Sequence, residues 1–420
     1  MLKPEENELL TRVGPGTPMG AYMRQFWTPV LRSERLSAGG APVRVRLLGE
    51  DFVAFRASDG RVGFFDEACP HRGVSLQMAT NEGDGLRCAY HGLKLGPTGE
   101  ILDVPCERPE RRSEYAAKIK VGHYPVREAG LVVWVYIGAG QPPQFPKYDF
   151  FALPKEHLDV CVGIVHANWL NGLEGQLDSA HVPILHRDWL RQVNGNRRRI
   201  GARGVISYDT GPRFEFENTL YGYREAAVRK APGDMRYVRV RDFVVPYYSF
   251  IPIGGRADDH DMTISVPVDD EHSAQWDVVY NYVRPLGPEN NARRIDGVDD
   301  IAQGIAPLGV EQRFGQNRAR MKEGSWAGFS HLRYEDFAVA MAQGIICDRS
   351  REYLGMSDTS INRARRMLLD AVKRFAKGEP AFGTDERIDY SPIRAEDAVI
   401  PAGEDWRKVA REFVEEGAAG

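Results

Sequence analysis

Short runs of alternating apolar and polar residues dominate the first third of the chain. From Pro42 the sequence reads VRVRLLGEDFVAFRASDGRVGFFDE, and Gly-containing turn signals divide it into short strands. The apolar run at residues 131–137 is typical of a buried strand. A stiff, proline-rich segment follows at residues 142–146 and indicates a domain boundary. We therefore predict an all-β first domain over residues 1–150.

The remainder, residues 151–420, is predicted to form one larger domain of mixed type. Residues 165–187 are predicted to form a helix that crosses the core. Between residues 204 and 282, runs such as FEFENTLYGY and QWDVVYNYV alternate in a way that suits an antiparallel sheet with one covered face. A further helix is predicted near residues 357–378, with its apolar stripe toward the core and a solvated basic face. The pattern as a whole predicts an α+β protein.

Composition excludes several classes of protein. A formal net charge of −4 implies no general affinity for nucleic acid or anionic membranes. No apolar stretch approaches the length needed to span a membrane. Of the five cysteines, three are scattered along the chain and odd in number: Cys106, Cys161 and Cys347. We interpret them as free thiols, which are typical of a reducing cytoplasm. We therefore expect a cytoplasmic protein.

The most informative motif combines two cysteines with two histidines. Cys69 and His71 form one pair, and Cys88 and His91 form the second pair after a gap of sixteen residues. Two thiolates and two imidazoles are the ligand set of a Rieske [2Fe–2S] cluster, in which two histidines replace two cysteines on one iron. The alternative is a structural Cys2His2 zinc site, but zinc sites of that class usually have a Cys pair followed by a His pair. The alternating order favours the cluster.

A second motif lies in the predicted helix, where Asp178, His181 and His186 occur within nine residues. Two histidines and a carboxylate on an open face form the triad that binds catalytic Fe(II). Residues five apart on an ideal helix lie about 140° apart in projection, so the two histidines converge only if the helix is distorted. Pro183 lies between them and supplies that distortion. The alternative is an ordinary pair of histidines on a polar helix.

These motifs together resemble the alpha subunit of Rieske non-haem iron ring-hydroxylating oxygenases, especially the phthalate 4,5-dioxygenase-like group. The likeness covers nearly the whole chain, including Met321-Lys-x-Gly and the Glu335-Asp336-Phe-Ala-Val segment. It implies a Rieske domain followed by a catalytic domain of the helix-grip type. It also implies that the third iron ligand is a distant carboxylate, which falls on Asp336 with Glu335 as the alternative.

The resemblance further implies how the two metal sites cooperate. In this family the residue that matches Asp178 is not an iron ligand; it bonds a metal-ligating histidine and also a cluster histidine of the neighbouring subunit. By position, that second histidine is His91 of the partner subunit. Electrons then cross a subunit boundary, which implies a ring, most often an α3 trimer. They come from a separate partner, by resemblance an NADH-dependent flavin/iron–sulfur reductase, since the chain lacks a dinucleotide-binding fingerprint.

The function expected from this resemblance is O2-dependent hydroxylation of an aromatic acid. O-demethylation of a methoxylated aromatic acid is the alternative, and a Rieske electron carrier is the alternative of another class. We expect pocket residues from the sheet after residue 204 and from the helix around Glu174. Four aromatic residues of the predicted sheet are candidates for the pocket lining, but we favour their interpretation as core residues: Phe243, Tyr247, Phe250 and Tyr280. Recognition of a carboxylate would use an arginine, for which the candidates are Arg187, Arg203 and Arg241.

Overall fold

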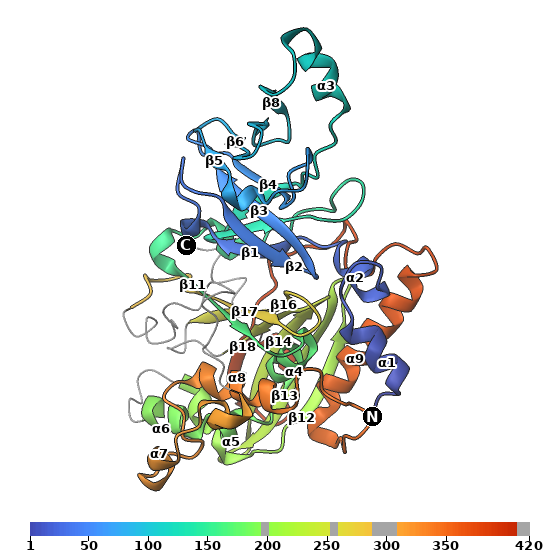
Figure 1. Cartoon of the computed structure of the whole chain (residues 1–420). Coiled ribbons are helices and arrows are strands. Elements are labelled where there is room, and N and C mark those ends of the chain that lie inside the picture. The colour runs from blue at the N-terminus through green and yellow to red at the C-terminus, as the bar shows by residue number, and fades with distance from the viewer. Residues whose placement is uncertain (195–200, 253–258, 288–308, 410–420) are drawn as a thin grey trace. The chain divides into compact units, whose positions relative to one another are not determined.

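The computed structural model separates into two compact units, which Figure 1 shows with their elements labelled. One unit comprises residues 24–145, and the other comprises residues 1–23 together with 146–420. The structure describes residues 1–194, 201–252, 259–287 and 309–409. The first unit is built from β-strands and the second from an antiparallel sheet with helices, so the α+β fold expected from the sequence is confirmed.

The smaller unit contains three small antiparallel sheets, with strand orders β1-β10-β9, β2-β3-β4 and β5-β6-β7-β8. Its elements are β1 (Thr28–Arg32), β2 (Val43–Leu47), β3 (Glu50–Arg56), β4 (Val62–Asp66), β5 (Thr80–Asn81), β6 (Leu86–Arg87), β7 (Lys94–Leu95), β8 (Ile101–Asp103), α3 (Arg112–Lys118), β9 (Val126–Ala129) and β10 (Val132–Val135). Phe55 and Phe65 stack in its core, where Cys69 and Cys88 are also buried. The cysteine loops are therefore anchored in the core of the unit.

The larger unit is organised around an eight-stranded antiparallel sheet in its described part. The strand order is β11-β17-β16-β15-β14-β13-β12, with β18 paired to β14. The strands are β11 (Leu158–Val165), β12 (Arg213–Asn218), β13 (Gly222–Ala231), β14 (Met235–Val244), β15 (Tyr248–Ile251), β16 (His260–Pro267), β17 (Ser273–Tyr280) and β18 (Glu396–Pro401). Strands β11 and β18 lie outside residues 204–282, where the sequence predicts the sheet.

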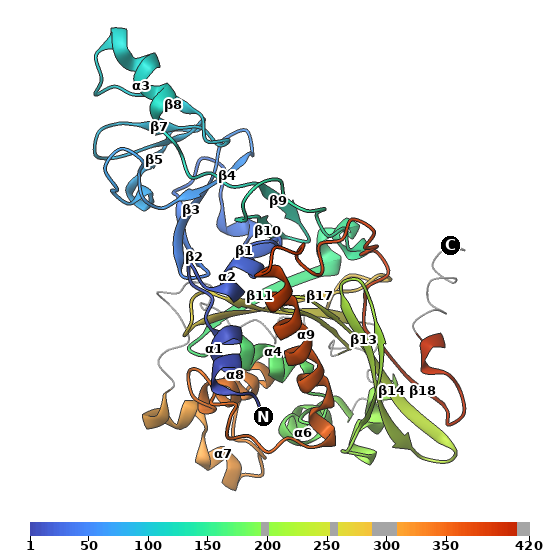
Figure 2. The ribbon, with the colours of Figure 1, turned by 90° about the vertical axis from the view of Figure 1, so that its right-hand side faces the viewer.

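Helices from distant parts of the chain pack beside this sheet. They are α1 (Pro4–Thr11), α2 (Pro18–Met23), α4 (Trp169–Leu177), α5 (Val182–Leu185), α6 (Arg187–Asn194), α7 (Arg318–Lys322), α8 (Leu332–Ala342) and α9 (Thr359–Phe375). Helix α4 contacts β15, β16 and β17 on one side and α8 and α9 on the other. Figure 2 shows α1 and α9 side by side, as their contacts require. Helix α4 is therefore enclosed between the sheet and other helices.

The prediction of a single helix over residues 165–187 is wrong. The chain instead forms the end of β11, the helix α4, a break at residues 178–181, and the short helices α5 and α6. Helix α4 ends before Asp178, which has extended backbone geometry. Pro183 lies in the first turn of α5, where its missing N–H costs nothing, so it begins a helix rather than bending one.

The first 23 residues belong to the larger unit, whereas the sequence analysis placed them in a first domain over residues 1–150. The indole N–H of Trp169 donates to the carbonyl of Leu10 at 3.1 Å, and the ring of Tyr22 packs edge-on against Phe375 at 6.0 Å. Apolar residues of α1 and α2 are thus buried against α4 and α9. The periodicity of a short N-terminal helix does not reveal the element against which it packs.

Candidate active site

The two cysteine–histidine loops share one backbone scheme. In each loop the cysteine N–H donates to the carbonyl five residues later, and the glycine four residues after the cysteine donates back to it, at 2.8 to 3.0 Å. Those glycines, Gly73 and Gly92, have φ angles of +74° and +76°, a region that favours glycine. The repeated turn places Cys69 and Cys88 at equivalent positions, with a histidine two residues after the first and three residues after the second.

The residues of these loops fit a Rieske cluster. The rings of His71 and His91 lie 4.5 Å apart, and both cysteines are buried free thiols. The Nδ1 atom of His91 is buried and has no hydrogen-bond partner in the described part of the chain, as expected for an atom that binds a metal. Burial raises the pKa of the Cys69 thiol to about 11, and Cys88 adds to the effect. Thiolates at this position therefore require cationic partners, which iron ions supply.

In the larger unit, the break after α4 carries the second histidine motif. Asp178 accepts the backbone N–H of Ala180 at 2.7 Å, which forms a tight turn directly before His181. His181 precedes α5, and His186 follows it. The two histidines therefore flank a single short helical turn, and their rings converge from its two ends.

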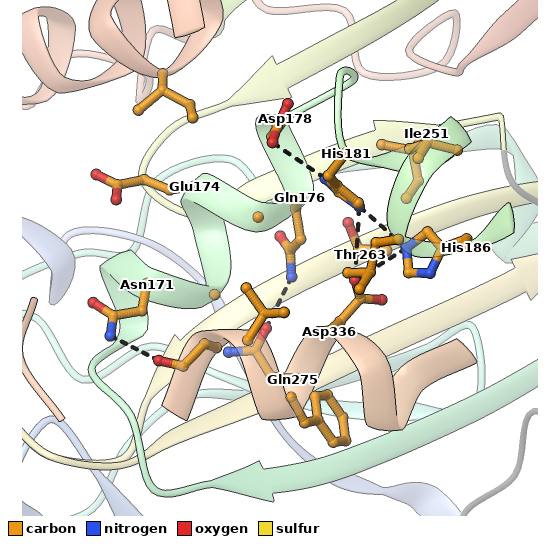
Figure 3. Close-up of a pocket in the computed structure, with 18 of the residues that line it drawn as sticks. Asn171, Glu174, Gln176, Asp178, His181, His186, Ile251, Thr263, Gln275 and Asp336 are labelled. Atoms are coloured by element: carbon orange, nitrogen blue, oxygen red, sulfur yellow. Dashed lines mark hydrogen bonds and ion pairs between the residues drawn. The ribbon is translucent and has the colours of Figure 1, made fainter. Parts of the chain in front are cut away.

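Asp336 on α8 completes this group, as Figure 3 shows. The Nε2 atoms of His181 and His186 lie 3.1 Å apart, and Asp336 Oδ1 lies 3.7 Å and 3.1 Å from them, respectively. Ligand atoms at right angles, each roughly 2.1 Å from one ion, lie about 3 Å apart. The three side chains therefore fit a single metal ion bound by two histidines and one carboxylate.

Each histidine of this group also faces a second carboxylate. Glu335 Oε2 lies 2.6 Å from Nδ1 of His186, and Asp178 Oδ2 lies 3.4 Å from Nδ1 of His181. Burial alone would lower the pKa of His186, but Asp336 and Glu335 outweigh it and raise that pKa to about 9. The surroundings of His186 thus favour positive charge, which a divalent cation would provide.

A cavity of about 280 Å³ adjoins the three converging side chains. Helices α4 and α8 and strands β14 to β17 contribute to its lining, which includes Glu174 of α4 and Asp178 directly after it. Its apolar wall includes Ile251, Trp276 and Phe337. The four aromatic residues considered in the sequence analysis are buried and are not among the lining residues, in agreement with their interpretation as core.

Buried arginines border the cavity. Arg239 and Arg241 line it, whereas Arg187 stacks over Trp326 and Arg203 lies among residues whose side chains are not described. Arg241 pairs with Glu225 and donates to the last carbonyls of α4. Of the three arginines considered from the sequence, Arg241 is among the lining residues, which also include Arg239, Arg333 and Arg365.

Ser179 joins Arg239 to another buried arginine. Its hydroxyl accepts from Arg239 at 3.1 Å and from Arg229 at 3.2 Å. The pKa of Arg229 is lowered to about 9, chiefly by burial and then by the nearby Arg239. Within the described part of the chain, Nε and Nη1 of Arg229 are buried without a hydrogen-bond partner.

Comparison with protein families assigns both units. Residues 26–125 match the Rieske [2Fe-2S] domain, and residues 135–419 match the family described as LigXa C-terminal domain like. The chain is 38% identical to the phthalate 4,5-dioxygenase oxygenase subunit of Pseudomonas putida, over 99% of this chain and 96% of the relative. The chain therefore belongs to the Rieske non-haem iron oxygenases, as an oxygenase subunit.

Other relatives extend the comparison. The 3-chlorobenzoate-3,4-dioxygenase oxygenase subunit of Comamonas testosteroni is 34% identical over 98% of both chains. The 5,5'-dehydrodivanillate O-demethylase oxygenase subunit of Sphingobium sp. is 29% identical over 90% of this chain and 82% of the relative. The terminal oxygenase of carbazole 1,9a-dioxygenase from Novosphingobium sp. KA1 has the same fold, with a TM-score of 0.57, 20% identity, and coverage of 86% of this chain and 97% of that one.

Among the described residues, none of the helices is both long and apolar enough to cross a membrane.

Sequence reasoning missed the side chains that surround the metal-site residues. It treated Glu335 only as an alternative to Asp336, and it did not consider Ser179, Arg229 or Arg239. One available signal was the alternation along β14, where Arg239 and Arg241 occupy every second position between valines. Polar residues on one side of a strand whose other side packs in the core indicate a lined cavity or a polar interior.

Proposed function

We propose that this oxygenase subunit oxidises a small aromatic acid at a mononuclear iron held by His181, His186 and Asp336. The observation that carries the proposal is the convergence of these three side chains at a cavity bordered by buried arginines. In this proposal Cys69, His71, Cys88 and His91 hold the Rieske cluster. When bound, the cluster supplies single electrons and the mononuclear iron supplies O2 activation.

The arginines support an acidic substrate. A carboxylate entering the cavity meets Arg239, with Arg229 buried behind it, while the apolar wall accommodates a ring. Guanidinium groups recognise carboxylates well, and enclosure away from water strengthens the attraction. The relatives named for phthalate and 3-chlorobenzoate act on aromatic acids, in agreement with this chemistry. O-demethylation of a methoxylated aromatic acid is the second candidate, favoured by the dehydrodivanillate O-demethylase relative.

We further propose the electron path and assembly that the sequence analysis implied. An NADH-dependent flavin/iron–sulfur reductase in the cytoplasm reduces the cluster, and the chains form an α3 ring. Asp178 retains a partly exposed carboxylate beside His181, and Nδ1 of His91 is buried without a hydrogen-bond partner among the described residues, so in this proposal Nδ1 binds the cluster. The outer nitrogen of His91 of the partner subunit is then available to Asp178.

The test uses a panel of aromatic acids with a surrogate reductase and NADH. Each acid is paired with its neutral amide, and O2 uptake and products are measured. We expect turnover of acids but not of their amides, ring hydroxylation with unmethoxylated acids, and formaldehyde release if a methoxylated acid is demethylated. Arg239→Gln should raise KM for the acid, whereas Arg213→Gln at an exposed position should not. Equal turnover of acid and amide would contradict the role of the arginines.

A further inference from the structure

The two carboxylates behind the metal-site histidines occupy very different surroundings. Glu335 lies 2.6 Å from His186 Nδ1, and the side chains of both residues are almost fully buried, at 6% and 1% exposure. Asp178 lies 3.4 Å from His181 Nδ1, and both side chains are more than 20% exposed. The contact between Glu335 and His186 is shorter and less accessible to water, so it is the stronger hydrogen bond.

Their other partners increase this difference. Asp178 uses its second oxygen to hold the turn before His181 through the N–H of Ala180. Glu335 lies in the first turn of α8 and directly precedes Asp336, so one helix supplies both a converging carboxylate and the group behind His186. Successive helical residues point about 100° apart, which lets Glu335 and Asp336 reach opposite nitrogens of the same ring.

We infer that Glu335 is a positioning residue that secures the metal through His186, whereas Asp178 contributes little to metal affinity. The inference rests on the proposed metal centre. An N–H donated from Nδ1 to a carboxylate fixes the tautomer in which Nε2 is unprotonated and faces the ion. The negative charge of Glu335 also makes the imidazole a stronger ligand. Because His186 is buried, water cannot replace this partner.

The experiment measures Co(II) binding to the full chain after chelation has removed the mononuclear metal and left the cluster in place. Cobalt absorption gives Kd for the parent and for four variants: Glu335→Gln, Glu335→Leu, Glu335→Asp and Asp178→Asn. Loss of such an outer partner typically weakens metal binding about 10- to 100-fold. We expect Co(II) to bind about 10-fold more weakly to Glu335→Gln, which keeps a hydrogen-bond acceptor but loses the charge. We expect about 100-fold weaker binding to Glu335→Leu, which loses both the acceptor and the charge. Glu335→Asp should lie between the parent and Glu335→Gln, and Asp178→Asn should stay within about 3-fold of the parent.

The possible outcomes separate the inference from the function on which it rests. If the parent binds no Co(II), the proposed metal centre itself is wrong. If the parent binds Co(II) and Glu335→Gln binds it equally tightly, Glu335 has no positioning role. An equal loss in Asp178→Asn and Glu335→Gln would contradict the division between the two carboxylates. Calorimetric unfolding of the metal-free variants controls for misfolding, and Glu335→Gln decides the question if Glu335→Leu does not fold.

Discussion

Replacing Glu174 by glutamine should destabilise the larger unit substantially, because this residue balances two buried arginines. Its carboxylate accepts from Arg349 at 2.9 and 3.0 Å and from Arg365 at 2.6 Å, and all three side chains are buried. Removing one partner of a buried ion pair costs about 3–5 kcal/mol. Arg365 keeps Glu352, and Arg349 keeps Asn171, so we take the lower value of about 3 kcal/mol. At roughly 2 °C per kcal/mol, the melting temperature should fall by about 6 °C.

The effect should also depend on pH. Burial alone would raise the pKa of Glu174 above its ordinary value of 4.5, but Arg349 and Arg365 outweigh burial and lower it. A carboxyl group with a lowered folded-state pKa stabilises the fold above its unfolded-state pKa and loses that contribution as pH falls through the folded value. The difference between parent and Glu174→Gln should therefore be full at pH 7 and shrink well below pH 4.5.

Scanning calorimetry measures the transition of the larger unit, while the visible absorption of the cluster follows the smaller unit separately. Glu8→Gln is the matched control, since Glu8 pairs with Arg12 at the surface of the same unit. Exposed pairs of this kind contribute less than about 1 kcal/mol. A melting temperature for Glu174→Gln no lower than that of Glu8→Gln, at every pH, would refute the reasoning.

The remaining predictions concern the metal sites. His71→Cys should shift or abolish the electron paramagnetic resonance signal of the cluster, because imidazole ligation raises its potential; an unchanged spectrum would remove His71 from the ligand set. His91→Ala should lose the cluster yet retain mononuclear iron by metal analysis. Asp336→Ala should lose the mononuclear iron and turnover but keep the cluster colour, and full activity would assign the carboxylate ligand elsewhere. Asp178→Asn should keep both metals and the oligomer but slow electron transfer in a single turnover; transfer at the parental rate, or full activity of a monomer, would contradict the bridge across subunits.

The fold class and the spacing of the motifs were predictable because they depend on local patterns. Strand alternation and the apolar stripe of α9 follow from periods of two and 3.6 residues, and α9 indeed buries Ile361, Ala364 and Leu368. The turns around Cys69 and Cys88 repeat a Cys-to-Gly spacing that is visible in the sequence. Such features need no knowledge of distant contacts.

Features that depend on long-range packing were not predictable in the same way. The break after Leu177 is stabilised by Arg241 from β14, which binds the carbonyls of Gln176 and Leu177. No local sequence pattern near residue 177 indicates that an arginine 64 residues later in the chain binds these carbonyls. Likewise, Glu335 and Asp336 are adjacent acidic residues, and only the placement of α8 beside His186 decides which one faces which ring nitrogen.

The most direct test of the account is a single turnover under labelled oxygen. The parent protein, with its cluster reduced and an accepted aromatic acid bound, is exposed to 18O2, and the product is analysed by mass spectrometry beside that of Asp336→Ala. We predict that the oxidised product of the parent carries 18O, and that Asp336→Ala yields no product although its cluster is equally reduced. A parent product without the label, or labelled product from Asp336→Ala in equal yield, would contradict oxygenation at the site formed by His181, His186 and Asp336.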